Sequence, residues 1–264
     1  MWLRDFFLAT PPAASVTCDV PLRIDIITLF PELFGPFVGT SIPKRAAQKG
    51  LVSYHLTNLR DFATDQHKSV DDRPFGGGPG MVMMCQPMFD AVEAIERLDP
   101  RPATRIILSP QGRKFEQPLA EELAKKDRLL LIAGHYEGFD QRIIEGLSPM
   151  ELSIGDYVLS GGELAAMIVI DAIVRLLPGA LGAEDGAADE SFADGLLEFP
   201  QYTRPREFRG MSVPEVLLSG NHQNIAAWRL EQRKSKTRES RPDLWQEYLK
   251  TKSEVSSQRS EVVD

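Results

Sequence analysis

The chain has 264 residues, 42% of them hydrophobic, and a net charge of −8, so it is long enough to bury a full core in one or two domains. Its two cysteines, Cys18 and Cys85, lie far apart and belong to no CxxC or Cys/His set, which argues against a disulfide framework or a structural zinc site and favours a reducing cytoplasm. No apolar run approaches the roughly 18 residues that a membrane span needs, and residues 1–21, with Arg4 as their only cation, are interpreted as a disordered extension rather than a signal peptide.

Short apolar strands alternate with helices through the first part of the chain. The hydrophobic pattern predicts strands over 24–30, 105–109 and 129–133 and helices over 87–98, 118–126 and 163–177. This alternation is typical of an α/β fold with a mostly parallel sheet. The strongly apolar 163–177 helix is expected in the core or in a subunit interface.

The composition changes at residue 181. Residues 181–199 hold six acids and no base, as expected of a mobile linker or lid, and they end a first domain over 22–180. Residues 200–250 are predicted to form a small domain with helices over 213–218, 225–236 and 243–250, followed by a disordered tail over 251–264. This small domain has ten Lys or Arg and six acids, although the whole chain is acidic. A polyanionic partner would explain that asymmetry, and a solvated helical face is the alternative.

The run IGDYVLSGGE at 154–163 is the most informative stretch. Its β-forming residues from Ile154 to Leu159 predict a strand that ends at Gly161 and Gly162, and a helix begins at Glu163. Glycines between a strand and a helix let a ligand approach main-chain N–H and C=O groups closely, which suits a nucleotide-like cofactor. A tight turn between strand and helix is the alternative.

Two further glycine-bearing turns follow predicted strands, LSPQG at 108–112 and AGHYEG at 133–138. Ligands of open α/β sheets collect outside the carboxyl ends of strands, so three such loops are expected to converge on one ligand. The GxGxxG and GxxxxGK[ST] motifs are both absent. The glycine cluster at 74–80 is therefore interpreted as a hinged lid. The preceding DDR at 71–73 could hold a metal, a sugar or base edges, or form a loop salt bridge.

Six blocks in order resemble the bacterial tRNA (guanine-N1)-methyltransferases of the TrmD type. They are VDDRPFGGGPGMVM (70–83), LSPQGRKF (108–115), AGHYEGFDQR (133–142), SIGDYVLSGGELAA (153–166), SFADGLLEFPQYTRP (191–205) and VPEVLLSGNH (213–222). The resemblance implies a SPOUT-type mostly parallel sheet with a deep trefoil knot, a rare exception to unknotted topology. It also implies a small helical C-terminal domain that binds tRNA, and a cytoplasmic homodimer whose active site is built from both subunits.

The same resemblance implies methyl transfer from S-adenosylmethionine to N1 of the guanine at position 37 of tRNA. Cofactor contacts, mostly through backbone groups, are implied for Leu108, Ser109, Pro110, Gly134, Tyr136, Glu137, Ile154, Gly155, Asp156, Tyr157, Val158, Leu159, Gly161 and Gly162. Contacts to the guanine and to tRNA are implied for Asp71, Gly80, Glu198, Tyr202 and Arg204.

The reaction needs a base, because guanine N1 carries a proton at neutral pH, whereas the sulfonium methyl needs only in-line placement. The family has an acid, usually Asp, directly before the Ser-Phe of the SFxxGLL block. Glu190 stands there in this chain, so Glu190 is the expected base, with Asp189 as the reserve and Asp194 as a linker acid. Arg175 matches the family arginine that orients the guanine or supports the base.

The chain departs from the family pattern at two further positions. His135 stands where relatives often have Arg, and Ala165 where many have Pro, and both are expected to tune the pocket. The family is associated with magnesium, but no motif locates an ion and no metal ligand is assigned. Two alternative functions are a SPOUT methyltransferase acting on another RNA site and a catalytically inactive RNA-binding protein. The Glu190 block and the intact cofactor glycines argue against them.

Overall fold

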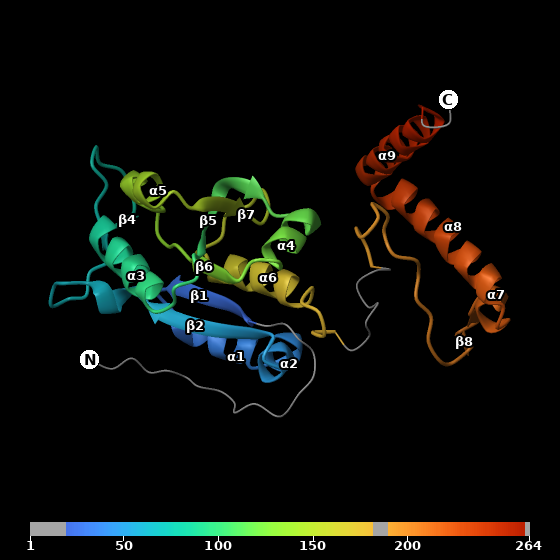
Figure 1. Cartoon of the computed structure of the whole chain (residues 1–264), viewed down its shortest axis with the longest axis horizontal. Coiled ribbons are helices and arrows are strands. Elements are labelled where there is room, and N and C mark those ends of the chain that lie inside the picture. Colours follow the sequence, from blue (N-terminus) through green and yellow to red (C-terminus); the bar gives the residue numbers. More distant parts are fainter. Residues whose placement is uncertain (1–19, 182–189, 262–264) are drawn as a thin grey trace. The chain divides into compact units, whose positions relative to one another are not determined.

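The computed structural model describes residues 20–181 and 190–261. The chain divides into two compact units, Met1–Glu184 and Asp185–Asp264. The first unit is an α/β domain and the second is helical (Figure 1). Most of the predicted N-terminal extension and residues 182–189 of the acidic linker lie outside the described residues.

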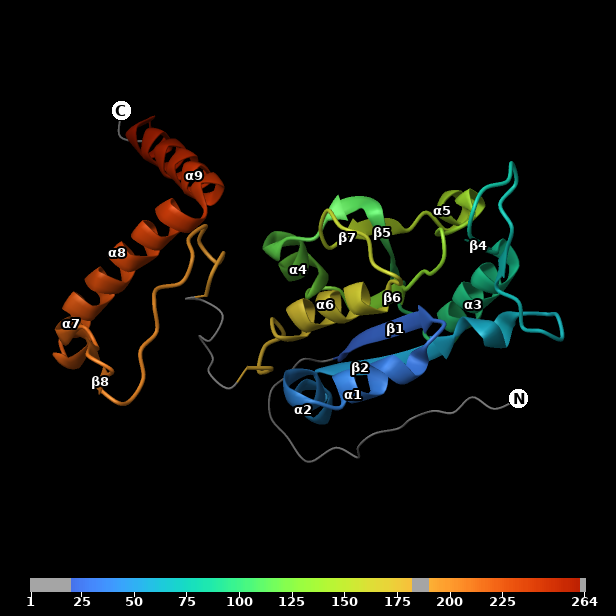
Figure 2. The same ribbon diagram turned by 180° about the vertical axis from the view of Figure 1, so that it is seen from behind.

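A five-stranded sheet forms the centre of the first unit, and all of its neighbouring strands are parallel, as predicted. Its order is β2-β1-β6-β5-β7. The strands are β1 (Leu22–Thr28), β2 (Val52–Asn58), β5 (Thr104–Lys114), β6 (Arg128–Ile132) and β7 (Met150–Ser153). Neighbours far apart in the chain, such as β1 and β6, lie side by side in Figures 1 and 2.

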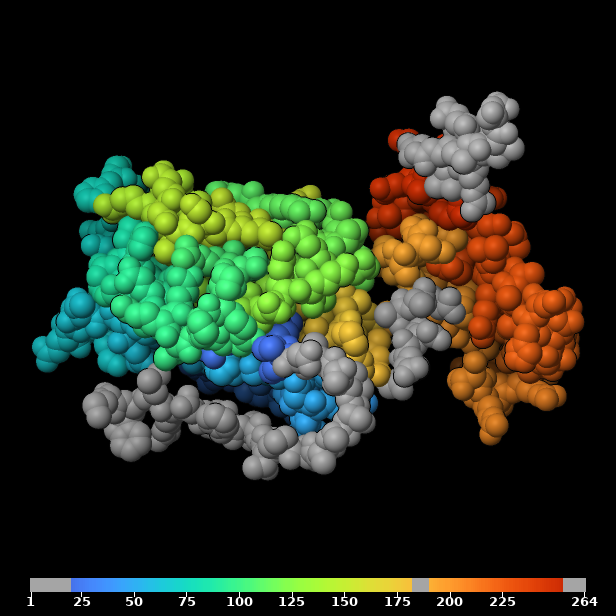
Figure 3. Space-filling model, viewed as in Figure 1, coloured from blue at the N-terminus to red at the C-terminus, as the bar shows by residue number. Residues whose placement is uncertain are grey.

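Helices cover both faces of this sheet, so its central strands are apolar throughout. Leu129 and Leu131 of β6 pack in one hydrophobic cluster, and Leu130 and Ile132 pack in another. The first cluster includes side chains from α1 (Phe34–Val38), α2 (Ser41–Gln48), α4 (Gln117–Leu123) and α6 (Glu163–Val174). The second includes side chains from η2 (Leu59–Phe62), α3 (Cys85–Arg97) and α5 (Gln141–Leu147). The side chains of β1 are almost all buried, and only a small blue area is visible on the face that Figure 3 shows.

The strand predicted over Ile154 to Leu159 is wrong. The strand of this region, β7, ends at Ser153, and the chain then turns because Gly155 adopts a φ of +146°. The Ser153 hydroxyl holds this turn by accepting from Gly155 N at 3.2 Å and donating to Gly155 O at 3.1 Å. Tyr157 and Val158 are left exposed. These residues favour a strand, but they pair with no neighbouring strand in the described structure. A strand needs a pairing partner as well as suitable residues.

Several elements extend or add to those predicted. The sequence pattern missed α1, α2, β2 and α5, and β5 continues to Lys114 rather than ending at residue 109. A short hairpin of β3 (Asp71–Asp72) and β4 (Val82–Met83) encloses the glycine cluster at 74–80. A short 3₁₀ turn, η1 (Pro31–Leu33), follows β1.

The second unit contains a small hairpin and three helices among its described residues. These are β8 (Glu207–Phe208), β9 (Met211–Ser212), α7 (Glu215–Leu218), α8 (His222–Ser240) and α9 (Pro242–Glu261). Asn221 caps α8 by accepting from the backbone N–H groups of Gln223 and Asn224. Because α9 continues to Glu261, most of the segment predicted as a disordered tail from residue 251 is helical. None of the helices in the described ranges combines the length and apolarity required to cross a membrane.

Candidate active site

Loops leave the carboxyl ends of β6 and β7, and β5, which lies between these two strands in the sheet, is irregular at residues 109–112 near its own carboxyl end. In the β5 loop, Leu108 and Arg113 both pair with Leu152 of β7, so residues 109–112 leave the strand and return to it. A Cβ on Gly112 would overlap the backbone between Glu151 and Leu152. Glycine is therefore required there for close passage of two main chains, as the glycine-bearing turn suggests.

The loops after β6 and β7 contact each other directly. Gly162 N donates to Gly134 O at 2.8 Å, and His135 and Gly161 form an isolated antiparallel bridge. A Cβ on Gly162 would lie 2.8 Å from Gly134 N, closer than side-chain carbons normally approach backbone. Two of the three glycine-bearing loops that the sequence predicts to converge therefore contact each other. Their role in binding a cofactor stays a prediction.

Tyr136 connects one of these loops to the hairpin that carries Asp71. It adopts a left-handed conformation with a φ of +62°, and its hydroxyl accepts from Arg60 Nη2 at 3.4 Å. Burial and then the neighbouring Asp71 carboxylate raise the pKa of Tyr136, while Arg60 acts in the opposite direction. Asp71, which is predicted to contact guanine, thus lies beside Tyr136, which is predicted to contact the cofactor.

The end of the glycine cluster also lies along the β6 loop. Glu137 N donates to Met81 O, and Met83 N donates to Gly138 O, each at 2.9 Å. A Cβ on Gly80 would overlap the Glu137 side chain, so Gly80 allows this close approach. A recess of about 560 Å³ opens beside it, lined by Arg73, Pro74, Gly77, Gly78, Gly80 and Met81. Gly80, a candidate guanine residue, therefore lines an open recess and lies next to Glu137 of a candidate cofactor loop.

Arg175 does not join these loops within one subunit. It caps the C-terminus of α6, whereas Gly162 caps the N-terminus of the same helix. At 1.5 Å per residue, the two caps lie about 20 Å apart. Arg175 and the glycine loops therefore lie at opposite ends of α6.

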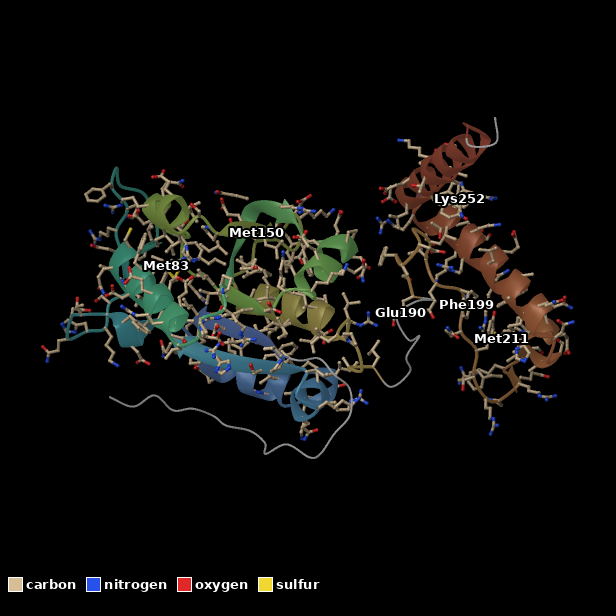
Figure 4. All side chains as sticks on the ribbon, viewed as in Figure 1. Met83, Met150, Glu190, Phe199, Met211 and Lys252 are labelled. Atoms are coloured by element: carbon tan, nitrogen blue, oxygen red, sulfur yellow. The ribbon has the colours of Figure 1, made fainter. Side chains whose placement is uncertain are left out.

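The other predicted catalytic and tRNA residues belong to the second unit. Glu190, labelled in Figure 4, begins its described part, and Glu190 O accepts from Ala193 N at 3.3 Å. Asp194 forms an ion pair with Arg233 of α8, as suits a structural rather than a catalytic acid. Asp189 lies outside the described residues. Glu198, Tyr202 and Arg204 follow Glu190 along the same unit, where the Tyr202 ring lies 6.3 Å from that of Trp228.

Residues 22–247 match the model of the family described as tRNA (Guanine-1)-methyltransferase TrmD. The chain belongs to this family. It is 56% identical over 226 residues to the tRNA (guanine-N(1)-)-methyltransferase of Moorella thermoacetica, covering 84% of this chain and 90% of that protein. For the proteins of the same name from Geobacillus kaustophilus and Rhodopirellula baltica, identity is 55% over 227 residues and 52% over 242 residues. These alignments cover 86% and 90% of this chain, and 93% and 100% of the two relatives.

Family membership and the parallel sheet together confirm the predicted fold class, and the trefoil knot stays a prediction. The sequence pattern predicted no role for Arg60. For Glu163 it predicted only that a helix begins there. Arg60 belongs to none of the motifs quoted above, and Glu163 belongs to the 153–166 block, but the contacts of both side chains are made only by the fold. The described side chains contain no group of three or more His, Cys, Asp or Glu arranged to hold a metal ion.

Proposed function

We propose that the protein transfers a methyl group from S-adenosylmethionine to N1 of the guanine at position 37 of tRNA. The observation that carries the proposal is the contact between the glycine loops at 134–137 and 161–162, beside the looped-out residues 109–112. These loops lie at the carboxyl ends of adjacent parallel strands, where α/β proteins bind nucleotide-like ligands. The relatives of the chain carry the name of a tRNA (guanine-N(1)-)-methyltransferase.

The residues of the three loops suit S-adenosylmethionine. Glycines at 134, 161 and 162 leave no Cβ in the way of main-chain groups. When bound, S-adenosylmethionine supplies an electrophilic methyl group on a positively charged sulfur. The chain's part is to hold it by backbone groups and to place guanine N1 in line, which accounts for a large share of such a rate enhancement.

Glu190 is proposed as the group that accepts the N1 proton, with Asp189 as the reserve. A carboxylate removed from water by a closing segment becomes a stronger base, since water no longer stabilises its charge. Arg175 is proposed to orient the guanine or to support that carboxylate. No cluster of described side chains suits a metal ion, so the proposed reaction includes no step that uses magnesium.

A homodimer with a composite active site is also proposed. Arg175 and the glycine loops occupy opposite ends of α6, which supports a site that takes them from two copies of the chain. A two-fold dimer would let α6 of one protomer supply Arg175 to the loops of its partner.

The second unit is proposed to hold the tRNA. Its cations lie over aromatic rings: Arg229 lies 4.5 Å from the Phe199 ring, and Arg238 lies 4.9 Å from the Trp245 ring. On the β8–β9 hairpin, Phe208 and Met211 pair across the strands and are both exposed, with Arg209 over the Phe208 ring at 5.1 Å. Cations mixed with exposed aromatic groups suit the phosphates and unstacked bases of an RNA loop. Action on tRNA supports a cytoplasmic location.

Methyl transfer from labelled S-adenosylmethionine to two tRNA transcripts tests the proposal. One transcript carries guanine at position 37 and the other carries adenine there. Guanine-dependent transfer that is lost in Glu190→Gln and retained in Asp189→Asn is the expected result. Transfer to both transcripts would point to another RNA site, and binding of tRNA without transfer would point to an inactive RNA-binding protein. Loss confined to Asp189→Asn would move the base by one residue.

A further inference from the structure

A buried carboxylate connects the N-terminus of α6 to the loop that follows β6. Glu163 is only 3% exposed. Its Oε1 accepts from the Thr28 hydroxyl at 2.7 Å, and its Oε2 lies 2.7 Å from His135 Nε2. A carboxylate is costly to bury unless its oxygens are hydrogen-bonded, so each partner lowers the cost of burying Glu163.

The hydrogen bonds of Thr28, Glu163 and His135 have defined directions. Thr28 Oγ1 accepts from Phe30 N at 3.0 Å, so its own hydrogen is directed to Glu163. The second carboxylate oxygen then accepts from His135, which must carry a proton on Nε2. The Phe30 ring packs edge-on against the His135 ring with centroids 5.0 Å apart. The imidazole is thus held in one orientation.

Gly161 makes room for this imidazole. A Cβ at Gly161 would overlap both the His135 ring and the Glu163 carboxylate. This glycine is therefore needed for contact between protein groups, in addition to any role in admitting a ligand. A glycine of the β7 loop, a histidine of the β6 loop and the first residue of α6 form a single packed unit.

The backbone of His135 is engaged as well. Its N–H points to Met83 Sδ at 3.2 Å, and its carbonyl accepts from Gly138 N at 3.2 Å. The next residue, Tyr136, is in the left-handed conformation. With side chain and backbone both held, His135 determines the path of residues 134–137.

We propose that the His135–Glu163 pair is a positioning device that holds the 134–137 loop in the conformation that binds S-adenosylmethionine. The inference rests on the proposed function, because it assumes that this loop contacts the methyl donor. His135 and Glu163 act through the loop and do not touch the reacting atoms. Loss of the pair weakens binding of the methyl donor while binding of tRNA and turnover at saturation are preserved.

Titration calorimetry with S-adenosylhomocysteine, the demethylated product, tests this on the full-length protein. His135→Ala is expected to weaken binding about ten- to a hundredfold, because it leaves a buried carboxylate oxygen without its donor. His135→Gln, whose amide N–H can take the place of Nε2–H, should stay within about threefold of wild type. Steady-state methyl transfer should show a raised KM for S-adenosylmethionine with kcat and the KM for tRNA little changed.

Thr28→Val is the matched control, because it removes the other donor to the same buried carboxylate without releasing His135. It should lower the melting temperature as much as His135→Ala and leave S-adenosylhomocysteine affinity within about threefold of wild type. If His135→Ala does not fold, His135→Asn replaces it, since its amide is too short to reach Glu163.

The outcomes separate the inference from the function on which it rests. Unchanged affinity in His135→Ala, or an equal loss in Thr28→Val, would overturn the positioning role while leaving the methyltransferase intact. A wild-type protein that binds no S-adenosylhomocysteine and transfers no methyl group would overturn the proposed function, and the inference with it.

Discussion

Arg128 and Asp25 form a buried ion pair across β6 and β1, with Arg128 Nε 2.8 Å from Asp25 Oδ2. Arg128 also donates to Ile95 O and to Asp99 O, each at 2.7 Å. Arg128 is the first residue of β6, so the pair lies at the amino edge of the sheet, opposite the carboxyl ends that carry the candidate loops. Stability and function can therefore be tested at separate ends of the same strands.

Arg128→Met should destabilise the α/β unit by about 3–5 kcal/mol, because it leaves Asp25 buried with only Arg23 as a cationic partner. Urea unfolding followed by circular dichroism measures the loss. Arg142→Met is the control, since the Arg142–Asp140 pair is largely exposed at its arginine and should contribute much less to stability than the buried pair. Equal losses in both variants would contradict the importance of burial.

Stability should fall as the pH drops below about 4. The Arg101 guanidinium, which donates to Asp99 at 2.7 Å, holds the pKa of Asp99 well below its usual range. The unfolded chain then binds more protons than the folded chain between the folded and unfolded pKa values, so stability rises with pH in that window. Thermal unfolding between pH 2 and pH 6 measures the slope. Asp99→Asn should flatten it, and an unchanged slope would show that Asp99 does not contribute.

Gly162→Ala should weaken S-adenosylhomocysteine binding more than about tenfold, because its Cβ would press against the backbone of Ala133 and Gly134 and separate the two loops. Gly35→Ala is the matched control: it lies in α1, and no atom lies within 4 Å of its Cβ position. Titration calorimetry measures the S-adenosylhomocysteine affinity of both variants. A similar effect of the two substitutions would rule out a specific role for the approach at Gly162.

Two inactive variants should restore activity when mixed, if the active site is composite. Arg175→Ala removes the side chain at one end of α6, and Gly162→Val disrupts the loops at the other. Random exchange of subunits would give heterodimers with one intact site, and about a quarter of wild-type activity. Methyl transfer after co-refolding measures the recovery. No recovery from dimers shown to have exchanged would mean that each site is built within one chain.

Phe208→Ala should weaken tRNA binding about five- to a hundredfold, the range expected for loss of one stacked base. Phe208→Tyr keeps the ring and should bind as wild type does. Arg209→Ala should instead lower the dependence of the affinity on salt by about one phosphate contact. Filter binding at several salt concentrations measures all three. An effect of Phe208→Ala on oligomeric state without one on tRNA affinity would assign the hairpin to a protein interface.

The sequence by itself determined the elements whose signals are local. The apolar runs of β1 and β6 and the helical spacing in α3 and α6 predicted those elements, because period and composition are carried by neighbouring residues. The glycines at 112, 134 and 162 marked the loops where two main chains pass closely. The six blocks of family motif indicated the reaction.

Only the tertiary structure decided which distant residues meet. The β-forming residues after Ser153 form no strand, because Gly155 turns the chain and no partner strand lies beside them. Glu163 reaches Thr28, 135 residues away in the chain, and His135, 28 residues away. That meeting depends on β1 and β6 being neighbours in the sheet and on α6 starting beside their carboxyl ends. Strand order is a property of long-range pairing, and no local pattern of residues carries it.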